Sequence, residues 1–298
     1  MSLTQWPSEV PRIAARDPAG HKGTFGRVLV VGGCVQPPTV MVGGPALAAL
    51  GALRAGCGLV ELAMPTSILV AGLTIAPSAV GHSIEVDPSG MAVAPAATAL
   101  AAQALRADVV VCGPGLGAAS TRIVESVLGA GKLVLDADAL NAVAADERLR
   151  VRLSARAPGT TILTPHVGEA ARLATALGLG AAASASEVSR ALGALVVLKS
   201  HESSIASRDQ AWSVRAGTSA LATAGSGDVL AGILGSLWAQ QPTADPFAVA
   251  CQAVCLHGLA SVRWSASHGA AGMLAQDLAA AIPAELEHWR LGGTPTIR

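Results

Sequence analysis

Residues 223–240 read TAGSGDVLAGILGSLWAQ and form the most informative segment of the chain. Small residues and glycines stand directly before a long apolar run, so the first backbone N–H groups of the expected helix are not blocked by side chains. These groups point along the positive end of the helix dipole, where phosphates and other anions bind. The sequence therefore predicts an anion hole made by Gly225, Ser226 and Gly227 at the start of a helix over residues 227–239.

Asp228 is expected in the first turn of this helix, and two interpretations of it are open. A carboxylate there can simply stabilise the helix dipole. The functional interpretation is a general base beside a bound phosphate, since a carboxylate next to an anion needs a reason to tolerate the repulsion.

Outside this segment, short Val-rich runs alternate with longer Ala- and Leu-rich segments, as in a parallel sheet that is buried on both faces. The expected strands cover residues 27–31, 59–64, 108–112, 132–136, 161–163, 195–199, 203–207 and 211–214. The expected helices cover residues 45–55, 120–128, 137–145, 168–177, 184–192, 227–239, 245–264 and 272–282. The prediction is an α/β fold: a three-layer α/β/α sandwich with a mostly parallel central sheet and a helical C-terminal third.

Most glycine and proline residues follow an expected strand, at the edge where such sheets bind ligands. The loop GPGLG over residues 113–117 permits close approach of a ligand to the backbone, although a plain strand-to-helix turn has the same composition. The pairs Gly32-Gly33 and Gly43-Gly44 are equally ambiguous when taken singly.

Charged residues also follow the strands. Asp136 and Asp138 could hold Mg²⁺ through water, or Asp138 could cap the next helix. His166, next to a glycine and a helix-opening glutamate, is either structural or a ligand contact. Lys199 closes an apolar strand and is either a surface charge or a phosphate contact.

Composition excludes several classes of protein. The 20 basic and 20 acidic residues give no net charge, so nothing favours a nucleic-acid or membrane-surface partner. Hydrophobic residues make up 51% and charged residues 13%, which excludes disorder and coiled coil. No uninterrupted apolar stretch reaches membrane-spanning length, and the N-terminus does not resemble a secretory signal, so a cytoplasmic location is expected. Residues 1–22 are expected to be an irregular arm, followed by a single domain over 23–298.

Several common motifs are missing from the sequence. The pattern GxxxxGK[ST] does not occur, GxGxxG does not follow the first strand, and there is no GxSxG. Phosphate binding must therefore use a different scaffold.

Seven blocks in order resemble the ADP-dependent NAD(P)H-hydrate dehydratase family, which has the ribokinase-like fold. They are HKGTFGRVLVVGG (21–33), GGPALAALGALRAGCGLVELAMP (43–65), CGPGLG (112–117), LVLDADALNAV (133–143), ILTPHVGEAARL (162–173), VVLKS (196–200) and TAGSGDVLAGILGSLWAQ (223–240). The resemblance implies a lyase that repairs the S epimer of hydrated NADH or NADPH, converting ADP to AMP and phosphate. It also implies Mg²⁺, a homotetramer and Asp228 as the catalytic base.

The resemblance implies further roles for named residues. Gly44, Gly117, His166 and Asp228 would contact the hydrated nicotinamide nucleotide. The adenine nucleotide would contact Gly227 and the segment made of Lys199, Ser200, His201, Glu202 and Ser203.

Some positions depart from the family pattern. Val167 replaces a usual Pro, Ser200 a usual Gly, and Gly44 a frequent Ala, while Thr218-Ser219-Ala220 stands where an Asn-Pro-Gly-like turn is common. The metal site, the preference between ADP and ATP and that between NADH and NADPH hydrates remain open. No epimerase domain is expected, because only about twenty residues precede the first block, so a separate epimerase would act in the same pathway. The alternatives are an ATP-dependent small-molecule kinase of the same fold and a nucleotide-binding regulator without turnover.

Overall fold

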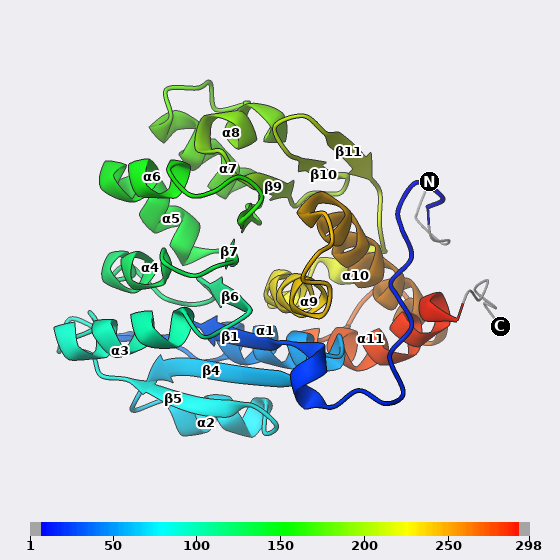
Figure 1. The fold of residues 1–298 in the computed structure, drawn as a ribbon, viewed down its shortest axis with the longest axis horizontal. Helices are drawn as coiled ribbons and strands as arrows, with labels where there is room; N and C mark the ends of the chain where they lie inside the picture. Colours follow the sequence, from blue (N-terminus) through cyan, green and yellow to red (C-terminus); the bar gives the residue numbers. More distant parts are fainter. Residues whose placement is uncertain (1–6, 292–298) are drawn as a thin grey trace.

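The computed structural model describes residues 7–291 and contains a nine-stranded sheet in the order β11-β10-β9-β8-β7-β6-β1-β4-β5 (Figure 1). Its strands are β1 (Arg27–Val31), β4 (Leu59–Pro65), β5 (Val80–Ile84), β6 (Val109–Cys112), β7 (Leu133–Leu135), β8 (Thr161–Leu163), β9 (Leu195–Leu198), β10 (Ser203–Ala206) and β11 (Ala211–Val214). The strands from β5 to β9 in this order are parallel, and β10 and β11 add an antiparallel edge.

Helices cover both faces of the sheet (Figure 1). One face carries α1 (Gly43–Arg54), α2 (Leu69–Ile75), α9 (Ser226–Gln240), α10 (Pro246–His268) and α11 (Ala275–Arg290). The other carries α3 (Ala94–Ala104), α4 (Thr121–Val127), α5 (Asp138–Ala145), α6 (Glu147–Ser154), α7 (Val167–Ala176) and α8 (Ala185–Leu192). The predicted three-layer α/β/α sandwich with a mostly parallel sheet and a helical C-terminal third is confirmed.

The sequence prediction missed several elements. They are the hairpin of β2 (Cys34–Gln36) and β3 (Thr39–Met41), the edge strand β5, helices α2, α3 and α6, and the short 3₁₀ helices at Lys22–Phe25 and Ser219–Leu221. Strands β2 and β3 have only three residues each, and β5 is half exposed. None of these three strands therefore forms the buried Val-rich run that marks the central strands.

The side on which new strands are added to the sheet changes between β1 and β6. From β1 it builds β4 and β5 on one side, then returns to place β6 on the other side of β1. In open parallel sheets, ligands bind outside the carboxyl ends of the strands at such a switch point. The loops that follow β1 and β6 are therefore where a ligand is expected.

Helices α1 and α9 pack unusually close together because glycines face the partner helix. A Cβ built on Gly232 of α9 would lie 2.0 Å from the carbonyl oxygen of Ala48, and one on Gly51 of α1 would lie 2.7 Å from that of Val229. Only glycine allows this backbone contact. The packing brings the first turns of the two helices together, since a Cβ on Gly225 at the start of α9 would lie 2.5 Å from Leu47 of α1.

Two further segments line the α9 side of the core. Residues 7–21 contain no helix or strand, but Val10 and Ile13 are buried there. Within the described residues, one helix, α10, is long and apolar enough to cross a bilayer, and 72% of its most apolar window is buried inside the protein. Such burial is typical of a core helix in a folded domain.

Candidate active site

The loops after β1 and β6 touch at the switch point. The Gly33 N–H donates to the Pro114 carbonyl at 3.0 Å, and a Cβ on Gly32 would lie 2.2 Å from the same oxygen. Gly115 and Gly117 have φ values of +64° and +69°, in the left-handed region that favours glycine. The glycines that are ambiguous in sequence thus form one tight double loop, and not two unrelated turns.

Gly44 joins this double loop to Asp228. A Cβ on Gly44 would lie 3.3 Å from Pro114 and 3.4 Å from Oδ1 of Asp228. The first turn of α1 therefore borders the Asp228 carboxylate directly. This contact depends on the close packing of α1 and α9.

The predicted anion hole lies at the start of α9. Gly225 is the N-cap with φ +89°, and a Cβ there would lie 2.5 Å from Leu47, so its backbone requires glycine. The Ser226 hydroxyl donates to the Leu221 carbonyl at 2.8 Å and faces away from the helix entrance. The Ser226 N–H makes a long hydrogen bond of 3.4 Å to the Thr223 carbonyl. The first-turn N–H groups have no acceptor within the helix, as is typical of a helix start that binds an anion.

Burial raises the pKa of Asp228 to about 7, and the negative charge of Asp136 adds to this, while Lys199 acts in the opposite direction. A carboxylate with such a pKa can accept a proton near neutral pH, as a general base must. The alternative interpretation, a solvated carboxylate that only stabilises the helix dipole, does not account for the raised pKa of this half-buried side chain.

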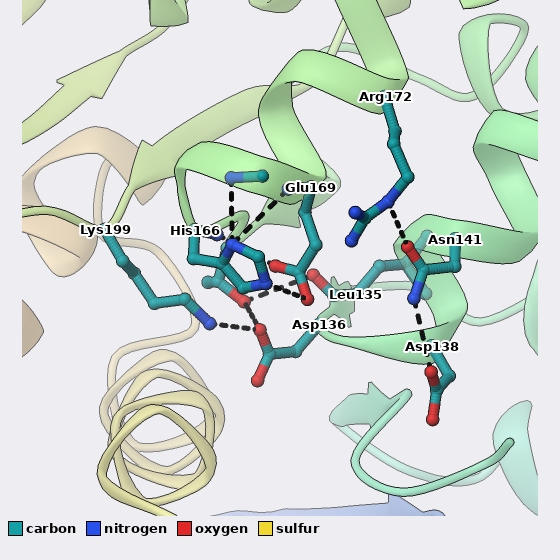
Figure 2. Close-up of polar contacts among 10 residues, drawn as sticks. Leu135, Asp136, Asp138, Asn141, His166, Glu169, Arg172 and Lys199 are labelled. Carbon is teal, nitrogen blue, oxygen red and sulfur yellow. Dashed lines mark hydrogen bonds and ion pairs between the residues drawn. The ribbon is translucent and has the colours of Figure 1, made fainter. Parts of the chain in front are cut away.

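Lys199 is not a surface charge: its side chain is 19% exposed and its Nζ donates to Oδ1 of Asp136 at 2.6 Å (Figure 2). The same oxygen accepts a hydrogen bond of 2.8 Å from the Thr164 hydroxyl. A Cβ on Gly227 would lie 3.2 Å from Nζ of Lys199. Burial lowers the pKa of Lys199, but Asp136 and more distant carboxylates outweigh it, so the pKa is raised and the ammonium stays charged.

His166 caps α7 and is coupled to Glu169. Its Nδ1 accepts from the Gly168 N–H at 2.9 Å, and Oε2 of Glu169 accepts from the His166 N–H at 2.8 Å. The second ring nitrogen, Nε2, lies 3.3 Å from Oε1 of Glu169. Burial raises the pKa of Glu169, with Lys199 acting in the opposite direction. His166 is also paired with Lys199 by an isolated parallel β-bridge, so the two predicted site residues are neighbours.

Asp138 does not cap α5, which corrects that sequence interpretation. Ala137 is the N-cap, and Asp138 instead accepts the Gly117 N–H at 2.8 Å and Nδ2 of Asn141 at 3.2 Å. Nε of Arg172 donates in turn to Oδ1 of Asn141 at 2.9 Å (Figure 2). Asp138 therefore fixes the loop that contains Gly117.

The segment 199–203 borders a cavity of about 480 Å³. The lining residues are Ser200, His201, Arg215, Ala216, Gly217, Thr218, Ser219, Leu221 and Ala222. Glu202 pairs with Arg215 at 3.1 Å, and Ser203 donates to the Ser200 carbonyl at 3.3 Å. Lys199 is not part of this lining, because its side chain turns toward Asp136.

Three features of the site were not predicted from sequence. They are the ion pair of Asp136 with Lys199, the buried Glu169, and His257, whose Nε2 donates to the Ser226 carbonyl at 2.9 Å from behind the anion hole. The first pair could have been found from the strand order, since β7, β8 and β9 are neighbours. His257 lies inside an apolar helix, and nothing in its sequence neighbourhood marks it. Among the described residues, no group of three or more His, Cys, Asp or Glu side chains could hold a metal ion.

A family model described as NAD(P)H-hydrate dehydratase matches residues 28–284, which is most of the chain. The chain belongs to this family. An ADP-dependent (S)-NAD(P)H-hydrate dehydratase of Neisseria meningitidis is 39% identical to this family member over 90% of the chain and 87% of its own length.

Solved structures agree with this assignment. The ADP/ATP-dependent NAD(P)H-hydrate dehydratase of Bacillus subtilis, co-crystallised with ATP and Mg²⁺, is 27% identical with a TM-score of 0.72, covering 95% of this chain and 100% of that one. A ribokinase-like superfamily protein of Enterococcus faecalis has a TM-score of 0.77 at 24% identity, covering 95% and 93%. It shows the same fold, so the expected ribokinase-like architecture of this dehydratase family member is confirmed.

The dehydratase family also includes longer proteins. A bifunctional NAD(P)H-hydrate repair enzyme of Gloeobacter violaceus is 39% identical over 89% of this chain but only 50% of its own length. The chain thus spans about half the length of such bifunctional relatives.

Proposed function

We propose that this protein dehydrates the S epimer of hydrated NADH or NADPH back to NADH or NADPH, with ADP converted to AMP and phosphate. One observation carries the proposal: the Asp228 carboxylate, with a pKa of about 7, borders Gly44, while the residue before it, Gly227, borders the Lys199 ammonium. A base is thus placed between a prospective substrate surface and a prospective phosphate site.

The chemistry follows from the poor leaving ability of hydroxide. Asp228 removes the proton from the hydroxyl on the hydrated nicotinamide ring, and that oxygen attacks the terminal phosphorus of ADP, releasing AMP. Phosphate then departs with the electrons of the C–O bond, the adjacent carbon loses a proton, and the ring double bond returns. The backbone N–H groups of Gly225, Ser226 and Gly227, together with Lys199, would stabilise the charge on the transferred phosphoryl group.

Both substrates have a place in this arrangement. Gly44 borders Asp228, Gly117 follows β6 and His166 follows β8, and these three residues would contact the hydrated nucleotide. The cavity beside Ser200, His201, Glu202 and Ser203 would take the adenosine part of ADP, with its phosphates directed toward Gly227. Its volume of about 480 Å³ lies within the ordinary range of small-molecule sites.

Mg²⁺ is proposed to arrive with the nucleotide. Both oxygens of Asp138 and Oδ1 of Asp136 already accept hydrogen bonds from the protein. A cation held mainly by phosphate oxygens and water, with few protein carboxylates, fits this donor set. When bound, it would neutralise charge on the phosphates.

The test is recovery of absorbance in the reduced-nicotinamide band when the protein and Mg²⁺ are mixed with hydrated NADH and ADP, ATP or neither. Recovery with ADP is expected, and recovery with ATP alone would reassign the donor. If neither nucleotide restores the band in a folded sample that binds nucleotide, the dehydratase proposal is wrong. A kinase for small hydroxymethyl compounds would then be assayed.

The family resemblance also supports proposals on assembly and location. We propose a homotetramer in the cytoplasm, acting alongside an epimerase that converts the R epimer to the S epimer. Sedimentation of the purified protein and localisation of a tagged copy test the first two points. Coupled assays with a mixture of both epimers test the third.

A further inference from the structure

The end of β7 carries a buried carboxylate whose contacts all lie within the site. Asp136 is 1% exposed, and its Oδ1 accepts from Thr164 at 2.8 Å. The same oxygen accepts from Lys199 at 2.6 Å (Figure 2). These three residues follow the ends of three neighbouring strands, β7, β8 and β9. The strand edge therefore fixes the direction of the Lys199 side chain, which would otherwise be a flexible four-carbon stem.

The Lys199 ammonium has several possible carboxylate partners. It lies beside Gly227, and the charges of Glu169 and Asp228 also act on it. A lysine paired with Asp228 would neutralise the proposed base and withdraw from the phosphate position. In the structure its short contact is with Asp136 instead.

We propose that Asp136 is a positioning residue that holds the Lys199 ammonium beside Gly227, where it meets the transferred phosphoryl group, and keeps it from pairing with Asp228. This inference rests on the proposed function. Asp136 touches neither substrate itself and acts through Lys199.

The charged groups facing Asp228 make the effect measurable as a pH dependence. They are Asp136 directly after β7, Asp138 in α5, Glu169 in α7 and Lys199 directly after β9. Burial and the three acids raise the pKa of Asp228, and Lys199 lowers it. Loss of the Asp136 charge removes one raising effect and frees Lys199 to approach, so both changes lower the pKa of Asp228.

The first test is Asp136→Asn, which keeps the shape of the side chain and an oxygen acceptor for Thr164. We expect kcat to fall about 10- to 100-fold, as for loss of a fixed donor at a developing charge, with little change in KM for the hydrate. The acid limb of the pH profile should move to lower pH. Asp108→Asn is the matched control, because exposed Asp108 only accepts the Arg27 N–H at the opposite edge of the sheet. An unmoved acid limb in Asp136→Asn would overturn the proposal.

A double-mutant cycle separates positioning from a merely structural role. In a Lys199→Met background, Asp136→Asn should leave kcat at pH 8 unchanged. At that pH Asp228 is ionised in either variant, so only the positioning effect remains, and that effect requires Lys199. Asp136→Asn should also restore thermal stability, since the single Lys199→Met variant leaves a buried carboxylate unpaired. A further fall in kcat in the double variant would mean that Asp136 acts independently of Lys199, and would contradict the inference.

Calorimetric ADP binding at pH 6 and pH 8 provides a readout that does not need turnover. Ionised Asp228 repels the nucleotide phosphates, so the affinity of the wild type for ADP should fall as pH rises from 6 to 8. The fall should be smaller in Asp228→Asn, and this variant shows how much of the change comes from ionisation of ADP itself. In Asp136→Asn the fall should occur at lower pH. If this holds while hydrated NADH is not dehydrated, Asp136 positions Lys199 but the proposed function is wrong. Identical pH dependence in wild type and Asp136→Asn, or no ADP binding by the wild type, would refute the inference.

Discussion

Gly232 of α9 lies against the carbonyl oxygen of Ala48 in α1 so closely that a Cβ on the glycine would stand 2.0 Å from that oxygen. This contact lies well inside the protein, yet it determines how near the N-terminal ends of the two helices can come. Those ends carry Gly44 and Asp228, and a Cβ on Gly44 would lie 3.4 Å from Oδ1 of Asp228. The geometry of the proposed base therefore depends on Gly232, a glycine about one helical turn further along α9 than Asp228.

Replacing Gly232 with alanine should force α1 and α9 apart, because the clash is with backbone and not with a movable side chain. We expect a loss of about 1–3 kcal/mol in the free energy of unfolding, as for other overpacked sites, together with reduced turnover. Thermal unfolding and the dehydration assay measure the two effects. Gly131→Ala is the control, because nothing lies within 4 Å of a Cβ at Gly131. Equal behaviour of the two variants would contradict the packing argument.

Asp228→Asn should lower turnover by about 10² to 10⁴, as expected for loss of a general base. Nucleotide binding should remain, because the anion hole is made of backbone N–H groups. Steady-state kinetics and calorimetry with ADP check the two statements. Full activity in this variant would remove Asp228 from the mechanism.

The same substitution should make the protein more stable at pH 8 but not at pH 4. The folded-state pKa of Asp228, about 7, lies above its ordinary value of 3.8, so the folded protein loses stability as pH rises from about 4 to about 7. The loss is on the order of 2–4 kcal/mol, and asparagine avoids it. Denaturant unfolding of both proteins at pH 4 and pH 8 measures the difference. A difference that is independent of pH would mean that the surroundings of half-buried Asp228 do not raise its pKa.

His257 should have the opposite effect on stability. Burial lowers its pKa from 6.5 to about 4, so stability is lost as pH falls from about 6.5 toward 4, by up to about 3 kcal/mol. His257→Gln keeps a donor for the Ser226 carbonyl and should abolish this dependence. Between pH 4 and 6.5 the slopes due to His257 and Asp228 offset each other in the wild type, so unfolding of the single variants is needed to reveal each one.

Filling the cavity beside residues 199–203 should act on the nucleotide alone. Ala222 is exposed and lines this cavity, so Ala222→Trp places a ring there without disturbing the core. We expect the Kd for ADP to rise at least about 10-fold, equivalent to about 1.4 kcal/mol, while the affinity for hydrated NADH is retained. Ala222→Ser is the conservative control. Unchanged ADP affinity in Ala222→Trp would place the nucleotide elsewhere.

Much of the sheet can be predicted from the sequence because its central strands are buried on both faces. β1, β8 and β11 have the predicted bounds, β4, β6, β9 and β10 differ by one residue, and β7 is one residue shorter at each end. The elements that were missed lie where this burial is absent, as in β5, or where strands are too short to form a pattern, as in the β2–β3 hairpin.

The site itself was only partly predictable. Gly225 to Asp228 could be interpreted locally because an anion hole is built from consecutive residues. The role of Asp136 could not, because its partner Lys199 is 63 residues away and reaches it across the end of β8. Such a contact follows from strand order, which local pattern does not specify.

The covering of one sheet face by α9, α10 and α11 has a consequence for biosynthesis. These helices follow every strand in the chain, so a growing polypeptide presents the finished strands before most of that cover exists. Aliphatic side chains such as Val28, Val111 and Val134 then face water until the last segments emerge from the ribosome. Chains truncated after β11 should therefore aggregate or be retained by chaperones, and the enzyme should acquire its base and its solubility in the same late step.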